Sequence, residues 1–506
     1  MSEIKKTTLY LNKGVNRDSP PGALEDGFAS DLRHMRFDDG VSFKMPGITK
    51  YIAAVGGSQI NGLYSFADHA GVIHLLQGEV AEMNISAAAA AMAPFSGATN
   101  TFTGALKNRW SFAAWGAAGA SGLTILMTNG VNKPQKLIHP YVTAGSDLTD
   151  MSADAACPAA AGVVRVYQRH VFLLGDTANL NRVSWSDIDT YVIWTPTAAN
   201  DAGSIDLYES KTPVVGGDTL KMMFVVYTGN QIHTFQYIGG TYVFARQIAD
   251  YSTGLWSRDL LVSTEDAQFF MSPTNFYAFD GTRPQPIGKG IRKEVYKGIA
   301  HAIASHSANI DFSFAFHVRD KGEVWFCVPT NSAYPDLACV FNYWNGAWSL
   351  EDFATGSLAC AGIDQSPQTY PLIALSDHGV YSLGSGENKA LVAGDATAFT
   401  GYIDTPEFEG DEPEAVKHIL KIVPDITATA GINVGVRVGT RDTRNSAITW
   451  TPALADAATS FDPDVDKHID VRVSGRLGRV RIETSALASP FQVNKVSIYY
   501  VQEGDR

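Results

Sequence analysis

The chain has 506 residues, a formal net charge of −13, 45% hydrophobic residues and 18% charged residues. This composition excludes a disordered chain and a membrane protein, and the length predicts two to four domains or one repeat array. The acidic balance repels polyanions, so a face that wraps DNA with basic side chains is disfavoured.

The chain begins "MSEIKKTTLYLNKG", without a long apolar run, and no stretch of about 18 apolar residues follows, so we expect neither an export signal nor a membrane span. The four cysteines, Cys157, Cys327, Cys339 and Cys360, lack the paired spacing of a zinc site. We therefore expect reduced thiols, as in a protein made in a cytoplasm.

The opening stretch "GVNRDSPPGALEDGFASDLRHMRFDDGVSFKMPG", residues 14–47, combines turn-forming residues with regularly spaced apolar residues. "RFDDG" predicts a tight turn through Asp39 and Gly40, and "MPG" predicts a strand end followed by a positive φ. We assign residues 1–50 as an ordered edge segment that docks on the next domain or on a neighbouring molecule. A strand that closes a blade is an equally good interpretation.

Short apolar or alternating runs separated by turn residues fill residues 51–395. Turn signals such as Asn129-Gly130, Gly229-Asn230 and Asn345-Gly346 indicate hairpins, and the pattern apolar, aromatic, any residue, apolar returns as "LYSF", "FYAF" and "VYSL". About six or seven such units, spaced by roughly 40 to 55 residues, predict an all-β, propeller-like array of antiparallel blades. The alternative is a pair of β-sandwiches. Only residues 288–303 have helical periodicity.

Residues 396–506 are predicted to form a separate C-terminal β-sandwich. Strictly alternating runs such as "INVGVRVGTR" and "IDVRVSGRLGRVRIET" indicate at least four strands with an arginine-rich polar face. The preceding acidic run, "DTPEFEGDEPE" at residues 404–414, is interpreted as a solvated loop.

No phosphate-binding loop, dinucleotide fingerprint or hydrolase motif is present, so an enzyme is disfavoured. "DPDVDKHID" lacks the glycine and glutamate of a calcium loop and is interpreted as a solvated turn. His74, His170 and His233 lie in strand-like runs and are interpreted as satisfied structural histidines. The clusters "RWSFAAW" and "FNYWNGAW" could stack on sugars or bases, but core packing is favoured. We assign no catalytic, cofactor-binding or metal-binding residue.

The opening stretch resembles the amino-terminal signature of the tail tube or nozzle proteins of short-tailed bacteriophages, also called packaged-DNA stabilisation proteins. The likeness continues through "VSWSDIDTYVIW", "FYAFDGTRPQPIG" and "VFNYWNGAWS". At one position where an Asn is expected this chain has His34. The resemblance marks these assembly candidates: Gly14, Asn16, Asp26, Gly27, Asp31, Arg36, Phe37, Asp39, Gly40, Pro46 and Gly47.

The resemblance implies a structural virion protein that forms a ring of six subunits below the portal and adaptor. The ring would continue the channel through which genomic DNA leaves, retain the packaged genome until the host is engaged, and contact tail fibres or spikes and a tail tip or needle. It implies assembly in the host bacterial cytoplasm and a place in the virion tail, with no cofactor. The alternative function is a carbohydrate-binding or glycan-cleaving propeller that acts as a receptor-binding tail component.

Overall fold

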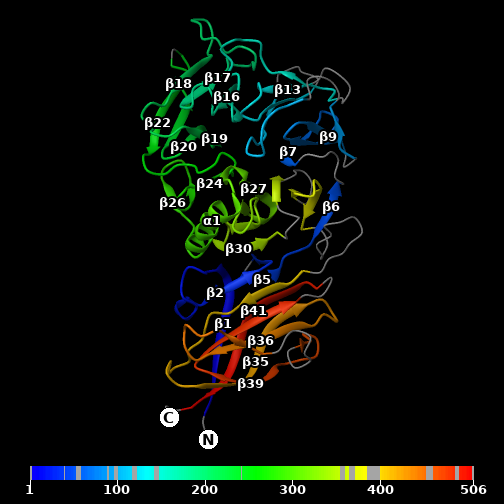
Figure 1. Ribbon diagram of the computed structural model, residues 1–506, viewed down its shortest axis with the longest axis vertical. Coiled ribbons are helices and arrows are strands. Elements are labelled where there is room, and N and C mark those ends of the chain that lie inside the picture. Colours follow the sequence, from blue (N-terminus) through cyan, green and yellow to red (C-terminus); the bar gives the residue numbers. More distant parts are fainter. Residues whose placement is uncertain are drawn as a thin grey trace.

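A computed structural model describes the following residues: 3–38, 40–52, 59–87, 91–95, 101–116, 122–141, 148–240, 242–353, 359–363, 371–384, 399–451, 460–484 and 489–503. The molecule is elongated, with a β-propeller at one end and a β-sandwich at the other, and both chain termini lie at the far end of the sandwich (Figure 1).

Seven four-stranded antiparallel sheets form the blades, which confirms the all-β, propeller-like prediction. Blade 1 contains β7 (Ile60–Ala67), β8 (Ile73–Glu79), β9 (Met83–Ala87) and β10 (Ala93–Pro94). Blade 2 contains β11 (Ser111–Trp115), β12 (Thr124–Thr128), β13 (Gln135–Leu137) and β14 (Leu148–Asp150). Blade 3 contains β15 (Val163–Tyr167), β16 (His170–Leu174), β17 (Arg182–Trp185) and β18 (Gly203–Asp206). Blade 4 contains β19 (Val214–Leu220), β20 (Met223–Thr228), β21 (Ile232–Tyr237) and β22 (Phe244–Asp250). Blade 5 contains β23 (Leu261–Ser263), β24 (Gln268–Met271), β25 (Phe276–Phe279) and β26 (Pro284–Pro286). Blade 6 contains β27 (Phe314–Val318), β28 (Glu323–Val328), β29 (Leu337–Asn342) and β30 (Ala347–Asp352).

Blade 7 is completed by a strand from the other end of the chain. Its first three strands are β31 (Ala359–Ile363), β32 (Leu372–Leu375) and β33 (Val380–Leu383), and its outermost strand is β6 (Ile48–Ile52). Ile52 pairs with Val380 and Ile48 with Leu383. The first strand of every blade contacts the first strand of the next, and β31 contacts β7. The ring is therefore closed, so neighbouring blades cover each other's faces and only short sheet edges remain.

The sandwich takes strands from both ends of the chain. Its first sheet contains β1 (Ile4–Val15), β2 (Gly27–Ala29), β4 (Met35–Asp38), β5 (Val41–Lys44), β35 (Lys417–Ala428), β39 (Ile469–Gly475) and β41 (Phe491–Gln502). Its second sheet contains β3 (Asp31–Arg33), β34 (Gly401–Asp404), β36 (Val434–Arg441), β37 (Thr449–Trp450), β38 (Ser460–Phe461) and β40 (Leu477–Thr484).

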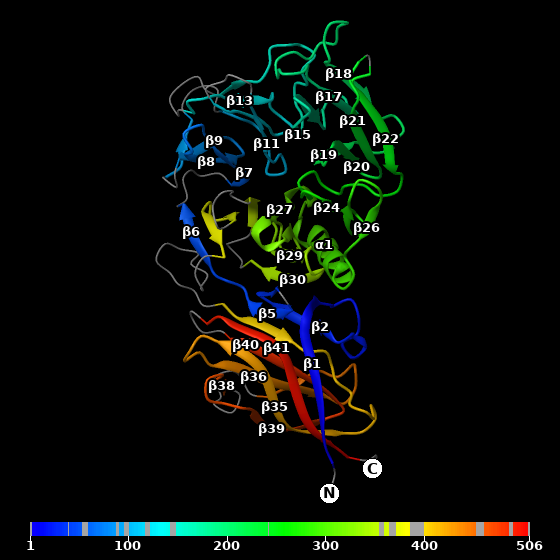
Figure 2. The same ribbon diagram turned by 180° about the vertical axis from the view of Figure 1, so that it is seen from behind.

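The opening segment is therefore divided between the two parts. Strand β1 pairs along most of its length with β41, and β6 joins the propeller, so the boundary predicted at residues 50 and 51 falls inside β6. One apolar core runs from the sandwich through β1, β3 and β4 into blades 5 and 6, where it includes Phe276, Phe326 and Trp348. Figure 2 shows β2 and β5 at the end of the sandwich that faces β30 of blade 6.

Helix α1 (Arg292–His306) connects blades 5 and 6, close to the predicted helix. It packs Val295, Ile299 and Ala302 against the core and ends at Ser307, which adopts the left-handed conformation. Three 3₁₀ turns accompany the strands: Pro21–Ala23, Ile310–Phe312 and Arg319–Lys321.

Two local expectations are wrong. "LYSF" lies in the first strand of its blade, whereas "FYAF" and "VYSL" lie in third strands, so the pattern marks strands buried on both faces and not one repeated position. Gly47 does not have a positive φ. The segment at residues 45–47 carries the chain from β5 in the sandwich to β6 in the propeller, and no left-handed residue is needed for that connection.

Candidate functional site at the propeller–sandwich junction

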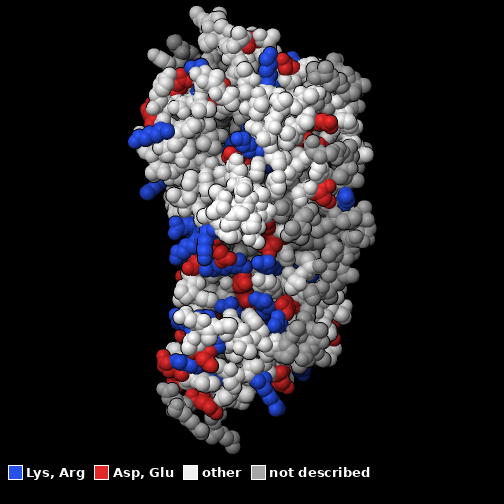
Figure 3. Space-filling view, in the orientation of Figure 1, with Lys and Arg blue, Asp and Glu red and all other residues white. Residues whose placement is uncertain are grey.

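Charged side chains gather where the propeller meets the sandwich, while most of the propeller face in the same view is uncharged (Figure 3). Most of the assembly candidates lie at this junction. The first of them, Gly14, lies where β1 crosses blade 6 and has a φ of +96°. A Cβ at this position would lie 2.7 Å from the backbone nitrogen of Trp348, so only glycine allows the two strands to approach this closely.

The residues after β1 hold the start of α1. Asn16 is buried, and its side chain accepts a hydrogen bond from the backbone N–H of Ser19. Asp18 accepts hydrogen bonds from the N–H groups of Lys293 at 2.9 Å and Glu294 at 3.3 Å, and so caps the helix from a distant part of the chain. Arg17 lies 2.7 Å from a Glu294 carboxylate oxygen. The opening segment is thereby tied to the propeller.

A polar chain continues from Arg17 into the second sheet of the sandwich. Arg17 pairs with Asp31, and the hydroxyl of Tyr402 donates to Asp31 at 3.1 Å. The guanidinium of Arg481 stacks on the Tyr402 ring at 4.1 Å and binds both carboxylate oxygens of Asp404. Although burial opposes its charge, Asp31 and Glu294 raise the pKa of Arg17.

Asp26 and Gly27 act inside the sandwich. Asp26 accepts a hydrogen bond from the N–H of Tyr10 at 3.0 Å. Gly27 begins β2 with a φ of +98°, and a Cβ there would lie 2.7 Å from the side-chain oxygen of Asn12. Both residues fix the parallel pairing of β2 with β1.

Arg36 is the centre of a buried ion cluster between β4 and blade 6. It is 3% exposed, with Nη2 3.4 Å from Glu351 Oε2 and Nε 3.7 Å from Glu323 Oε1. Its guanidinium lies 4.6 Å from the centre of the Trp325 ring. His34 hydrogen-bonds to the other oxygen of Glu351. Buried charges of this kind are tolerated only when each is paired, so the cluster fixes how the sandwich sits on blade 6.

Phe37 and Gly40 follow Arg36 in the β4–β5 hairpin. Phe37 is buried, and its carbonyl accepts hydrogen bonds from the side chains of Asn342 and Asn345. Gly40 has a φ of +77° in the turn, as the predicted tight turn requires, and nothing lies within 4 Å of a Cβ placed there. Asp39 lies outside the described residues.

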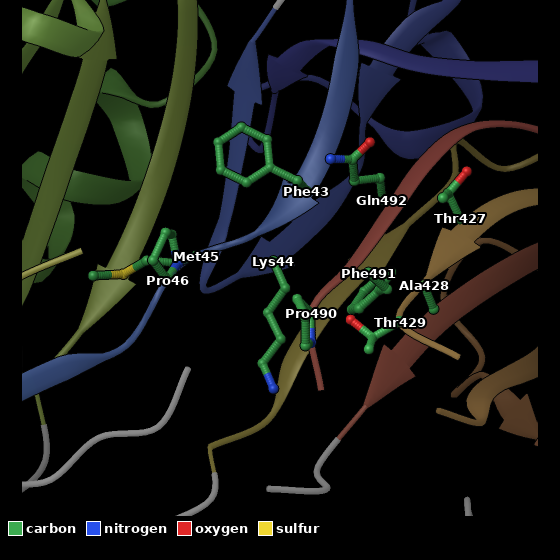
Figure 4. A pocket seen from close by; sticks show the side chains of 10 residues that line it. All are labelled: Phe43, Lys44, Met45, Pro46, Thr427, Ala428, Thr429, Pro490, Phe491 and Gln492. Carbon is green, nitrogen blue, oxygen red and sulfur yellow. The ribbon is translucent and has the colours of Figure 1, made fainter. Parts of the chain in front are cut away.

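A pocket of about 430 Å³ opens where β5 separates from β41. Figure 4 shows side chains from β5, from the end of β35 and from the start of β41 around it. Phe43, Pro46, Pro490 and Phe491 give it an apolar lining, and Lys44 is the charged residue of the lining. Gly47, the last candidate, accepts a hydrogen bond from the N–H of Gly384. Among the described residues that line the pocket there is no pair of carboxylates that could cleave a glycosidic bond.

The acidic run at residues 404–414 is not a solvated loop throughout. Asp404 is fully buried and Glu407 is 6% exposed, and they pair with Arg481 and Arg441 at 2.6 Å. Burial raises the pKa of Asp404 even though Arg481 opposes this. The run supplies counter-ions to the arginines of β36 and β40, a pairing that periodicity in the sequence does not reveal.

Sequence reasoning missed the propeller side of the junction: Glu294, Glu323, Glu351 and Trp325. One signal was available, because "EVWFCV" and "AWSLED" place single glutamates in strands whose other residues are almost all buried. A carboxylate in such a strand needs a basic partner from another element.

Side chains from non-adjacent blades meet at the centre of the propeller. Arg258, which precedes blade 5, donates to the carbonyl of Gly162 in front of blade 3 at 2.7 Å and to the carbonyl of Arg109 in front of blade 2. Arg109 Nε lies 3.3 Å from Asp259 Oδ2. These contacts bridge the propeller axis, so the blades behave as one stiff unit.

The three histidines singled out from the sequence lie in strands β8, β16 and β21. His74 hydrogen-bonds to Asp68 and His170 to the carbonyl of Ser186. His233 differs from the expectation, because it is fully buried and neither ring nitrogen has a partner among the described residues. Burial lowers the pKa of His233 to about 4, and nearby Arg246 acts in the same direction.

Within the described ranges no group of three or more His, Cys, Asp or Glu side chains is arranged to hold a metal ion. In the same part of the chain no helix is both long and apolar enough to cross a membrane.

No protein-family model matches the chain, and no curated protein matches its sequence. Among solved structures, Raptor from Chaetomium thermophilum is 10% identical with a TM-score of 0.41, over 69% of this chain and 30% of Raptor. A catalytically inactive virginiamycin B lyase from Staphylococcus aureus, solved with quinupristin, is 8% identical with a TM-score of 0.39, over 68% of this chain and 99% of the lyase. The match thus spans less than a third of Raptor, and one weak neighbour is a lyase. Neither similarity is strong enough to carry an argument about function.

Proposed function

We propose that this chain is a structural virion protein that forms the tail nozzle or tube ring of a short-tailed bacteriophage. The observation that carries the proposal is where the family-like residues lie. Gly14, Asn16, Asp31 and Arg36, which carry the resemblance, are the residues that hold the sandwich on the propeller. A motif that joins two parts of a scaffold fits a mechanical role better than a catalytic one.

In this proposal the DNA channel lies between copies of the chain and not through a propeller. The bridges from Arg258 and Arg109 occupy the propeller axis, so a duplex has no path there. The acidic chain would give a lumen that repels phosphates, which keeps friction low while the genome slides. Basic side chains would then gather at subunit contacts.

The ring would attach below the portal and adaptor and carry tail fibres or spikes and a tail tip or needle. Its work is to retain the packaged genome and then to guide it, and neither task includes a covalent step. The stiffness that this requires is supported by the closed seven-bladed ring and by the charge network at the junction.

Native mass spectrometry and electron microscopy of the purified full-length protein, alone and mixed with the portal–adaptor complex of the same virus, test the proposal. We expect a closed ring, alone or on the adaptor, with a bore wide enough for a duplex. A monomer under both conditions would overturn the proposal. Specific cleavage of a polysaccharide by the monomer would favour the carbohydrate-acting alternative.

A further inference from the structure

A basic ridge lies at the start of helix α1 and on the turn before it, and is defined here as Lys289, Arg292, Lys293 and Lys297. All four side chains are exposed, and none forms an ion pair with a described residue. In contrast, the acidic residue of the helix, Glu294, is neutralised by Arg17. Figure 3 shows Lys and Arg gathered over the position that α1 occupies in Figure 1. The ridge is a local positive patch on an acidic protein.

The ridge works against the stability of its own helix. Arg292 and Lys293 lie in the first turn of α1, where the helix dipole favours acidic side chains. Asp18 already occupies the N–H groups of Lys293 and Glu294, so the helix end is not a free anion site. The helix dipole does not favour these basic side chains, and their exposure leaves them available to an anionic partner outside the subunit.

The sandwich carries a patch of opposite charge. The aspartate turn, defined here as residues 462–470, contains Asp462, Asp464, Asp466 and Asp470 with one lysine, Lys467. Backbone hydrogen bonds to Asp462 and Asp466 shape the turn. Asp464 and Asp470 are exposed, although Asp464 accepts a hydrogen bond from the N–H of Gly431 at 3.4 Å and Asp470 lies 3.3 Å from His468 Nε2. Between the aspartates Val465 is 74% exposed.

We propose that the basic ridge of one subunit binds the aspartate turn of the next subunit in the ring. Figure 2 shows α1 on one flank of the molecule and β38, which leads into the turn, on the other. Two different patches on opposite flanks make a heterologous contact, and such contacts form a ring when the rotation between neighbouring subunits closes. Because α1 lies in the propeller and the turn in the sandwich, the subunits are inclined to the ring axis. This inference rests on the proposed function and names its subunit contact.

A duplex is the other polyanion that the ridge could meet, and the charges favour the protein partner. The whole chain has a net charge of −13, so a duplex that approaches four basic side chains also approaches a strongly acidic molecule. The aspartate turn offers the complementary charge and an apolar contact as well.

Charge reversal tests the contact. The ridge variant is Arg292→Glu, Lys293→Glu and Lys297→Glu, which places acids where the helix dipole favours them and so keeps α1 folded. The turn variant is Asp464→Lys and Asp470→Lys, which leaves the shaping residues Asp462 and Asp466 intact. The matched control is Lys107→Glu, Lys211→Glu and Arg283→Glu, which reverses three exposed and scattered charges.

Sedimentation velocity at about 0.1 M salt measures assembly, and circular dichroism melting verifies folding. We expect each variant alone to need at least about 100-fold more protein for half-assembly, and the control to behave as the native protein. An equimolar mixture of the ridge and turn variants should recover rings, because their subunits can alternate when the ring has an even number of places. The chain that combines both sets of substitutions should recover them as well.

The outcomes separate the two proposals. Native rings that persist in the ridge variant would overturn the contact and leave the ring proposal standing. A ridge variant that assembles but no longer binds a short DNA duplex would assign the ridge to nucleic acid instead. A native protein that is monomeric alone and on the adaptor would overturn the proposed function itself.

Discussion

The propeller and the sandwich are both made almost entirely of antiparallel strands, but the sandwich and its junction rely more on charge pairs. Residues 51–395 contain 29 acidic and 19 basic side chains. Residues 1–50 and 396–506 together are less than half as many residues, yet they contain 23 acidic and 20 basic side chains. Blades pack mainly through apolar clusters such as that of Phe172 and Phe224, with the Arg109–Asp259 pair bridging them, whereas the sandwich and its junction contain several buried ion pairs. Apolar packing gives the propeller cohesion, and directional charge pairs fix the orientation of the sandwich.

The largest effect should come from breaking the junction charges. Replacing Arg36 with Met leaves Glu351 and Glu323 buried beside an apolar side chain, and removal of one partner from such a cluster costs about 3 to 5 kcal/mol of unfolding free energy. Urea unfolding followed by tryptophan fluorescence measures it, since Trp325 lies against Arg36. As a control, Arg169→Met breaks a pair whose side chains are 66% and 53% exposed, and it should cost less than about 1 kcal/mol. Equal losses of unfolding free energy in the two variants would mean that the buried junction cluster stabilises the protein no more than an exposed ion pair does.

Two glycine substitutions sharpen the role of β1. Gly14→Ala places a Cβ 2.7 Å from the Trp348 backbone at a φ of +96°, so we expect a loss of about 3 kcal/mol from crowding and backbone strain. Gly40→Ala has a similar φ but open space around it, so about 1 kcal/mol should be lost. Thermal unfolding of the pair separates close packing from backbone strain. A Gly14 variant no less stable than the Gly40 variant would contradict the tight crossing.

The propeller should have its own pH dependence. The pKa of His233 is near 6.5 in the unfolded chain and about 4 in the folded protein. Between pH 4 and pH 6.5 the unfolded chain therefore binds a proton at His233 that the folded protein does not bind. Stability is therefore complete above about pH 6.5 and falls as the pH approaches 4, by about 2 kcal/mol at pH 5. Denaturant unfolding at pH 7 and pH 5 measures the loss, and His233→Leu should remove it. A variant with the same pH dependence as the native protein would show that His233 is not responsible.

The smallest effect is expected from two ion pairs that the acidic run forms with arginines. Glu407→Gln weakens a pair whose side chains are 13% and 2% exposed, and we expect a loss of about 2 kcal/mol. Glu409→Gln weakens a pair with Arg444, which is 57% exposed, and should cost less than about 1 kcal/mol. Thermal melting in low and high salt distinguishes them, because salt screens only the exposed pair strongly. Similar losses of stability in both variants would mean that burial does not decide how much each ion pair stabilises the protein.

Much of the local structure could be predicted from residue patterns. Period-two runs and the turns at Gly130 and Gly346 specify strands and hairpins because those signals act over a few residues, and the helix near residues 292–306 is visible for the same reason. The motif residues were also identifiable, but their tasks were not. Nothing near Arg36 in the sequence points to Glu323 and Glu351, which lie about 300 residues away.

The sequence by itself determined that the chain is all-β, acidic and repetitive, because composition and alternation are properties of short segments. Only the tertiary structure decided that β6 closes the seventh blade, that β1 belongs to the sandwich, and that the acidic run neutralises the arginines of β36 and β40. The physical reason is that strand pairing and charge burial depend on which distant segments meet. Local secondary-structure propensity does not specify these distant partners.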